Sequence, residues 1–185
     1  DYNSSTKNWN NDKLHSANAY EAGLTYLIGK TSNVYAKYGT VFRIPFLDEQ
    51  ASYYGFKTDL FNKELEKEIG KTMEIGTQIN PAAGLKIGAS LFRTDMENEI
   101  EWSQADGKNI NMDKTRHEGA EISGSWQINE LAKIYGNFTY HNAKFIAGAY
   151  QGNELPLVPR KMANLGVNLN LPFDFSLRPE IRYVD

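Results

Sequence analysis

The chain alternates between apolar and polar residues along about eight stretches, and this alternation is the feature that most restricts its fold. From Tyr20 onward the stretches are joined by connections that are alternately very short and long. Period-two patterning places apolar side chains on one face of a strand and polar side chains on the other. Loop lengths that alternate in this way indicate antiparallel hairpins side by side in one layer, as in the wall of a transmembrane β-barrel.

Four predicted hairpins account for the pattern. Within each hairpin the apolar residues are all even-numbered or all odd-numbered on both sides of the short turn. Two residues that face each other must therefore have numbers whose sum is even. Each turn then contains an odd number of residues, about three or five, unless a bulge intervenes. The apolar columns of the four pairs begin at Tyr20 and Val34, at Met73 and Leu85, at Ala120 and Ile134, and at Ala163 and Phe173.

Three long connections separate the hairpins, at residues 44–70, 95–115 and 145–160, and all are rich in polar and charged residues. Since they alternate with the short turns, all three are expected at the same rim of the sheet. Outer-surface loops of membrane barrels stand in this relation to short periplasmic turns.

Composition excludes other classes of protein. The 185 residues contain no Cys, carry a formal net charge of -3 and give no basic surface of the kind that binds nucleic acid. No stretch approaches the roughly 18 consecutive apolar residues of a membrane-spanning helix. The mean hydropathy of -0.56 does not argue against a barrel, because only alternate residues face lipid. The chain opens at Asp1 without a basic and apolar leader, so we expect any export signal to lie outside it.

Two other architectures remain open from the pattern alone. A soluble antiparallel sandwich also alternates, although its strands average about five or six residues and these stretches reach about ten or more. The unpaired edges of an open sheet must be closed in a bilayer. The strands therefore form either a small closed barrel of about eight strands, with a structural or adhesive role, or an arc of a larger barrel.

Five segments, in order along the chain, resemble motifs of one family. Tyr35 to Pro45, with Glu49 after it, resembles a Phe-Arg-x-Pro box at Phe42, Arg43 and Pro45. The other four are Leu65-Glu66-Lys67-Glu68 with Glu74-Ile75-Gly76, where Lys67 stands in place of the usual Pro; Leu91-Phe92-Arg93-Thr94-Asp95 with Asn98, Glu99 and Ile100; Asn111 with Gly119-Ala120-Glu121; and Leu155-Pro156-Leu157-Val158-Pro159-Arg160. Together they resemble the β-barrel of TonB-dependent outer-membrane receptors.

The resemblance implies an energy-coupled uptake receptor in the outer membrane of a Gram-negative bacterium. Its barrel would have 22 strands in contact with lipid and an N-terminal plug inside. Residues 1–185 would supply about eight of those strands, with the plug and the last strands outside the sequence. The expected partners are the plug, a TonB-type periplasmic energy transducer and a small-molecule ligand. Haem is not expected, because no His lies between Phe42 and Leu65, where haem importers of this family carry one. The resemblance then implies a ferric siderophore, the commonest remaining ligand of the family.

Site residues also follow from the resemblance. Glu74 and Glu121 are expected to face the lumen and to pair with arginines of the plug, where a charge-assisted contact is stronger than in bulk water; the alternative is that both are solvated lumen residues. Arg43 and Glu49 bracket a turn fixed by Pro45, and either shape the base of a long loop or contact ligand. The loop aromatics either bind ligand or anchor the loops; they are Tyr53, Tyr54, Phe56 and Trp102.

No catalytic, cofactor or metal motif stands out. His15, His117 and His141 are the only histidines, without metal-ligand spacing or a neighbouring Cys. The acidic run Asp95 to Glu99 lacks the glycine and spacing of a calcium loop, and there is no P-loop or dinucleotide motif. We therefore predict no enzyme, outer-membrane hydrolases included, and no resident cofactor, any ferric chelate being the transported ligand.

Overall fold

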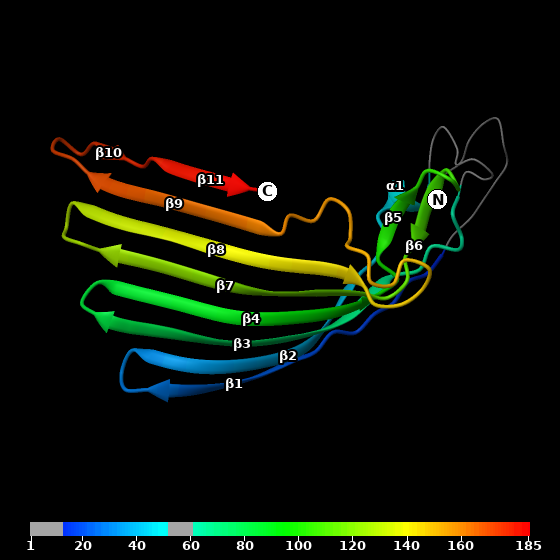
Figure 1. Ribbon diagram of the computed structural model, residues 1–185, viewed down its shortest axis with the longest axis horizontal. Coiled ribbons are helices and arrows are strands. Elements are labelled where there is room, and N and C mark those ends of the chain that lie inside the picture. The colour runs from blue at the N-terminus through cyan, green and yellow to red at the C-terminus, as the bar shows by residue number, and fades with distance from the viewer. Residues whose placement is uncertain (1–12, 52–60) are drawn as a thin grey trace.

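The computed structural model describes residues 13–51 and 61–185 and consists of one long antiparallel sheet with a smaller hairpin at one end (Figure 1). The sheet follows the order β1-β2-β3-β4-β7-β8-β9-β10, with β11 also paired to β9. Its strands are β1 (Glu21–Ile28), β2 (Ser32–Arg43), β3 (Glu68–Ala82), β4 (Leu85–Glu97), β7 (Thr115–Gln127), β8 (Ala132–Phe145), β9 (Lys161–Asn170), β10 (Ser176–Leu177) and β11 (Glu180–Val184). The other elements are α1 (Leu47–Gln50) and the pair β5 (Ile100–Ser103) and β6 (Lys108–Asn111).

The register confirms the parity argument. At three short turns the number of residues between the last paired residues is odd: residues 29–31 between Ile28 and Ser32, 128–132 between Gln127 and Lys133, and 171–175 between Asn170 and Ser176. The connection between β3 and β4 has an even number, residues 83–84, and there the register shifts between Ile79 and Ala82. A bulge of this kind restores the apolar residues of both strands to one face.

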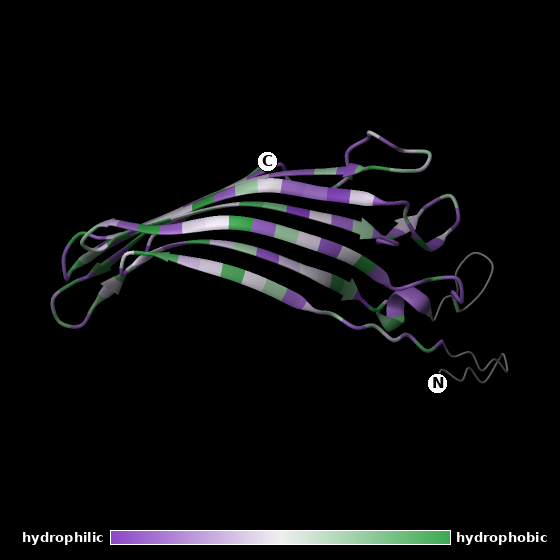
Figure 2. Cartoon of the chain, turned by 90° about the horizontal axis from the view of Figure 1, so that it is seen from below, coloured by the Kyte–Doolittle hydropathy of each residue, from purple (hydrophilic) through white to green (hydrophobic). Residues whose placement is uncertain are grey.

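The sheet has one apolar and one polar face, and colour bands alternate along its strands (Figure 2). Cross-strand pairing aligns Ile75 with Leu91 and Leu91 with Ala120, so apolar residues form continuous rows. Ile75 and Leu91 are each 57% exposed, and across the described residues no second layer covers their face. The soluble sandwich is therefore wrong for this chain, because a sandwich buries such rows between its two sheets.

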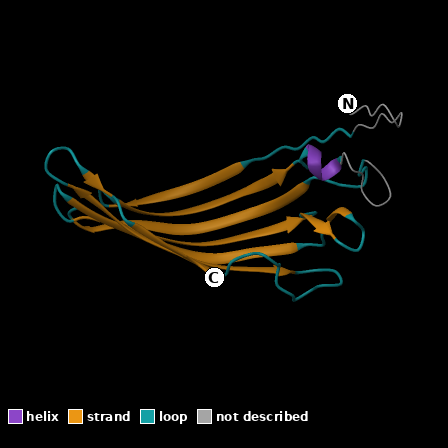
Figure 3. Ribbon diagram, turned by 90° about the horizontal axis from the view of Figure 1, so that it is seen from above, coloured by secondary structure: helices purple, strands orange, loops and turns teal. Residues whose placement is uncertain are grey.

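The sheet is curved and open (Figure 3). Among residues 13–51 and 61–185, β1 pairs only with β2 and β11 pairs only with β9, so these two edge strands do not pair with each other. A small barrel made of these strands alone would require that pairing. The open arc disfavours it and favours a part of a larger wall.

The three long connections all lie at one end of the sheet, as predicted, and the short turns lie at the other (Figure 1). Two predicted loop boundaries were wrong. Residues 68–70 belong to β3 and residues 95–97 to β4, because the ladder continues through the pair Arg43 and Glu68 and the pair Ile69 and Glu97. The β5–β6 hairpin inside the second long connection was not predicted, since strands of four residues are too short to show a period.

The buried hydrophobic side chains of the described residues lie at this loop end: Phe61, Leu65, Ala143, Phe145 and Leu155. Leu65 is only 1% exposed. Ala143, Phe145 and Leu155 form a cluster, and the partly buried Met112 and Val158 pack against that cluster. Within the described ranges no helix is long and apolar enough to cross a membrane.

Candidate functional site

The polar face of the sheet is the first candidate site. A hollow of about 510 Å³ lies over its middle strands. Its lining is mostly polar and includes Tyr35, Glu74, Ser90, Glu121, Ser123 and Thr139, although Ile87, Ala89 and Ile122 also border it. Alternation explains the polar part, because every second residue of β2, β3, β4, β7 and β8 points to the same side. A surface of carboxylates, hydroxyls and amides is suited to water and to polar ligands.

Glu74, on β3, is held by two neighbours from β2. Its cross-strand partner Lys37 places Nζ 3.0 Å from Glu74 Oε2, and the Tyr35 hydroxyl donates to Oε1. The Tyr35 ring lies over Gly76, where an added Cβ would come within 2.5 Å of the ring. Glycine therefore makes room for the ring to reach Glu74.

The same arrangement of an aromatic ring over a cross-strand glycine recurs twice on this face. The Phe92 ring covers Gly119, and the Tyr135 ring covers Gly166. The Tyr135 hydroxyl donates to Glu180 at 3.0 Å, as that of Tyr35 does to Glu74. Aromatic cover compensates a glycine in a sheet for its missing side chain.

Glu121, on β7, lies one row from Glu74 but has a different environment. Its cross-strand partners are Ser90 and Thr139. Its side chain is exposed, and among the described residues it has no ion pair or hydrogen bond. Of the two glutamates predicted to face inward, Glu74 has cationic and hydroxyl partners in the wall and Glu121 has none.

The predicted Phe-Arg-x-Pro box lies where β2 enters the first long connection. Arg43 Nη1 lies 3.0 and 2.8 Å from the two carboxylate oxygens of Glu49, and Arg43 Nη2 pairs with Glu68. Glu49 also accepts the backbone N–H of Phe46 at 2.7 Å, and Pro45 is buried between these residues in the chain. The arginine thus ties α1 to the end of β3.

Phe42 faces away from this group. As the alternation requires, it lies on the apolar face, beside its cross-strand partner Ile69, and is 40% exposed. The residues of the Phe-Arg-x-Pro motif therefore lie on both faces of the sheet. Arg43 and Glu49 belong to the polar contacts at the base of the loop, and Phe42 lies on the apolar face.

A second group beside Arg43 was not predicted. Glu99 accepts a hydrogen bond from the Thr115 hydroxyl and lies 3.2 Å from His117 Nε2, and His117 Nδ1 lies 3.2 Å from His141 Nε2. His117 and His141 looked scattered in sequence, but the β7–β8 register pairs His141 with Gly119 and so brings the two rings together. Parity required only that facing residues have numbers whose sum is even, so the sequence did not specify this register or the contact.

Electrostatics favour the charged form of Glu99. Burial by itself would raise the pKa of its carboxyl group, but the hydrogen bonds from His117 and Thr115 and the charge of His117 outweigh it, so the pKa lies below the ordinary value of 4.5. Glu68 links this group to Arg43, because it accepts the backbone N–H of Ile100 at 2.9 Å. We call Arg43, Glu49, Glu68, Glu99, Thr115 and His117 the loop-base network.

The long connections are also joined to each other by amide side chains. Asn62 donates to the carbonyl of Asn109, Asn109 donates to the carbonyl of Glu49 at 3.1 Å, and Asn111 donates to the carbonyl of Glu66 at 2.9 Å. Trp102 on β5 is 56% exposed. Tyr53, Tyr54 and Phe56 lie outside the described residues. Within residues 13–51 and 61–185 no three His, Cys, Asp or Glu side chains are arranged to hold a metal ion.

Comparison with known proteins identifies the family. The family model described as TonB dependent receptor-like, beta-barrel, matches residues 1–185. The catecholate siderophore receptor Fiu of Escherichia coli strain K12 is 29% identical over 171 residues, a match that covers 89% of this chain and 22% of Fiu. The chain therefore spans about a fifth of the length of the curated relatives it matches.

Solved structures agree with the sequence match. The crystal structure of the ferric-catecholate import receptor Fiu superposes with a TM-score of 0.63 at 28% identity, over 89% of this chain and 24% of that one. The siderophore receptor PiuA of Acinetobacter baumannii gives 0.65 at 20% identity, over 90% and 25%, and the copper transporter OprC gives 0.65 at 21% identity, over 90% and 26%. The last two establish a shared fold.

The match to the whole chain, the two-faced antiparallel sheet and the predicted order of motifs agree with one another. The chain belongs to the β-barrel family of TonB-dependent receptors.

Proposed function

We propose that the protein is an outer-membrane receptor that takes up a ferric siderophore with energy supplied through a TonB-type partner. The family consists of receptors and transporters of the Gram-negative outer membrane, and not of enzymes. The observation that carries the proposal is the match, over 89% of the chain, to a catecholate siderophore receptor. The two-faced arc supports it, because a barrel wall between lipid and a wet lumen requires one apolar and one polar face.

The strands of the long sheet, without the β5–β6 hairpin, are then part of a larger closed barrel, which we expect to have 22 strands. The short turns face the periplasm and the long connections face the cell exterior, as in outer-membrane barrels generally. Ligand is captured at the loop end, above the polar face, and passes through the barrel when the plug is displaced.

Glu121 and Glu74 are the proposed contacts with arginines of the plug. Both belong to the hollow on the polar face. Glu121 is free for such a contact, whereas Glu74 shares its carboxylate with Lys37 and Tyr35. A plug cation that pairs with Glu121 meets an uncompensated charge. We therefore expect Glu121 to contribute more to the latch than Glu74.

Uptake by cells tests the transport proposal. Cells that lack their other iron receptors would express the full-length protein and be given radioactive iron as a ferric catecholate, a ferric hydroxamate or ferric citrate, with haem and cobalamin as further ligands. We expect uptake of ferric catecholate that stops when the TonB-type transducer is deleted. Uptake of haem or cobalamin alone would contradict the siderophore assignment, and uptake without the transducer would contradict energy coupling.

Glutamine substitutions test the latch. Glu121→Gln should loosen the plug and change uptake more than Glu74→Gln, because only Glu121 has no partner in the wall. Ser123→Ala, on the same face, is the matched control. Plug release can be followed by spin labels on plug and wall. Identical plug mobility in all three variants would remove both glutamates from the latch.

A further inference from the structure

The apolar face changes character toward the loop end. On β4, β7 and β8 the apolar residues end at the row of Leu91, Ala120 and Tyr140, which the register aligns with Ile75 of β3. Beyond that row the same face carries charged side chains on these strands, whereas β2 and β3 still bring apolar residues to it alongside Lys71, such as Phe42 and Ile69. We call these the charged rows; they are Lys71, Arg93, Asp95, Glu97, Lys114, Arg116, Glu118 and Lys144.

Aromatic residues mark the boundary between the two zones. Tyr140 lies in the last apolar row, and Tyr38 pairs with Met73 in the next. They are 43% and 40% exposed. Tyrosines in such a position are typical of the level where lipid tails meet headgroups, because the ring is apolar and the hydroxyl is polar. The charged rows therefore lie at headgroup level on the surface that faces lipid.

The charges in these rows are only partly paired with each other. Asp95 lies 2.9 Å from Arg93 Nη2 and 2.6 Å from Arg116 Nε, and Lys114 lies 2.7 Å from Glu97. Lys71 and Lys144 have no carboxylate partner in the part of the chain that the structure describes. With five cations and three anions, the rows carry a net charge of +2, opposite in sign to the -3 of the whole chain.

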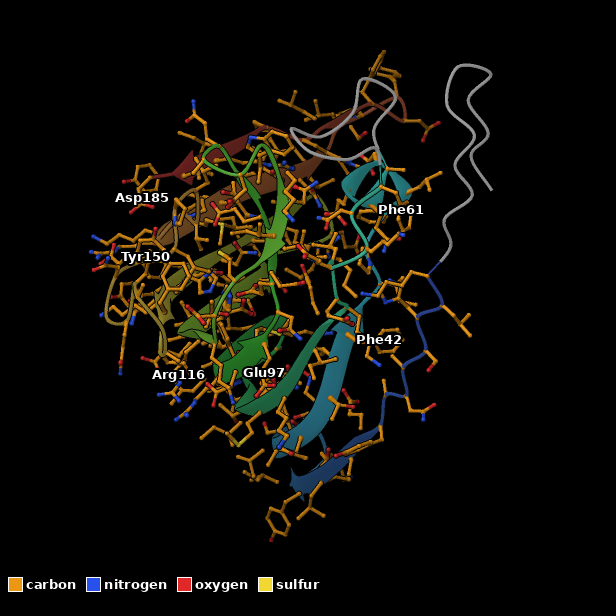
Figure 4. The ribbon with its side chains drawn as sticks, turned by 90° about the vertical axis from the view of Figure 1, so that its right-hand side faces the viewer. Phe42, Phe61, Glu97, Arg116, Tyr150 and Asp185 are labelled. Atoms are coloured by element: carbon orange, nitrogen blue, oxygen red, sulfur yellow. The ribbon has the colours of Figure 1, made fainter. Side chains whose placement is uncertain are left out.

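Two hollows open beside the shared Asp95–Arg116 pair. One, of about 590 Å³, is lined by Lys71, Asp95 and Lys114 together with the apolar Phe42 and Ile69. The other, of about 460 Å³, is lined by Arg116 and Lys144 together with Phe145 and Ile146. In the view from the loop end, Arg116 lies on the outer side of the arc, away from α1 and the β5–β6 hairpin (Figure 4).

We propose that the charged rows bind the phosphate groups of an anionic lipid of the outer leaflet, whose acyl chains lie along the apolar rows below. The cations supply the charge, and the guanidinium groups supply paired N–H donors that match phosphate oxygens. Clusters of lysine and arginine beside a membrane-spanning surface attract anionic headgroups in this way. The apolar rows directly below favour a lipid over a free phosphate, because a lipid has acyl chains that can contact these rows and a phosphate ion does not. This assignment rests on the proposed orientation, with the loop end at the cell surface.

Lipid retention tests the proposal on the full-length protein. The purified receptor would be mixed with lipid A that carries two phosphates, and bound lipid would be counted by native mass spectrometry. Replacing both unpaired lysines, Lys71→Gln with Lys144→Gln, should weaken binding roughly thirtyfold, since each cation at a lipid surface contributes a factor of about five. Glu118→Gln should strengthen binding by about the same factor of five.

The matched control makes the same change of charge on the polar face, Lys86→Gln with Lys133→Gln, and should bind lipid A as the unaltered protein does. Equal losses in the two double variants would overturn the proposal, because the effect would then be one of net charge. Displacement of lipid A by equimolar inorganic phosphate, or equal retention of phosphatidylcholine, would also overturn it. No iron or siderophore enters the measurement, so its failure is distinguishable from a failure of the transport proposal.

Discussion

The sheet and the loop end are stabilised in different ways. On the sheet, large apolar side chains such as Leu24, which is 76% exposed, have no protein cover among the described residues. At the loop end, Leu65 and Thr115 are buried to 1% and 0% exposure, and polar side chains join one connection to the next. The loop end therefore has a small protein core of its own, while the described strands are joined by their hydrogen-bonded ladder and have no core beneath them.

The largest effect should come from emptying the loop core. Leu65→Ala removes a fully buried side chain, and we expect it to lower the local free energy of opening by about 2–5 kcal/mol. Native-state hydrogen exchange of amides at the loop end measures this quantity. Leu47→Ala, at a site 72% exposed, is the control and should change exchange little. Equal exchange in both variants would mean that the loop end has no core.

A charge introduced on the apolar face should have the second-largest effect. Ile122→Arg should lower the free energy of unfolding in lipid vesicles by about 2–4 kcal/mol, because an arginine near the bilayer midplane loses its hydration. Ser123→Arg places the same side chain on the polar face and should cost little by comparison. Urea titration of the full-length receptor in vesicles measures both. Equal losses would contradict the assignment of faces.

The loop-base network should be more sensitive than the charges around it. Glu68→Gln weakens the contacts with Arg43 and the Ile100 amide, and we expect a local loss of roughly 1–3 kcal/mol because the Glu68 side chain is only 12% exposed. Exchange of the Ile100 amide reports the change. Glu64→Gln is the matched control, since its side chain is 82% exposed. Slower exchange at Ile100 in Glu68→Gln would refute the network.

The smallest effect should be the change in the stability of the loop base with pH. The pKa of Glu99 is lower in the folded protein than the ordinary 4.5, so its charged form stabilises the loop base above about pH 4.5. This contribution should fall as pH drops below 4.5 and disappear below the folded pKa. Hydrogen exchange at Thr115, followed between pH 6 and about 3, should reveal it. Glu99→Gln should remove the step, and persistence of the step in that variant would assign it to another carboxyl group.

The sequence predicted the strands and their faces because both depend on a local period. Parity predicted an odd number of residues between the paired residues of the turns after Ile28 and Gln127. It allowed for a bulge but did not say where one would lie, and the structure has it between Ile79 and Ala82. The boundaries near Glu68 and Glu97 were missed because charged residues continue the ladder there beyond the apolar rows. The alternation of apolar and polar residues no longer marks a strand where both kinds of position are polar or charged.

The candidate sites were less predictable. Arg43 and Glu49 were found by motif, but the contacts of Glu99 with Thr115 and His117 join residues 16 and 18 positions apart through a loop that has no period. The partners of Glu74 could have been read from the β2–β3 register, since Lys37 is its cross-strand neighbour. The contact of Tyr35 with Glu74 also required the glycine at position 76, a role that sequence alone does not reveal.

The rings of Tyr35 and Tyr135 need the room that Gly76 and Gly166 leave. An added Cβ would come within 2.5 Å of the Tyr35 ring and 2.4 Å of the Tyr135 ring, so an alanine at either position would push the ring away from the backbone that it covers. The hydroxyl of the displaced ring would then leave its glutamate, Glu74 or Glu180. At Gly119 the added Cβ would meet the backbone carbonyl of Tyr140 at 2.1 Å, so an alanine there would disturb the strand itself.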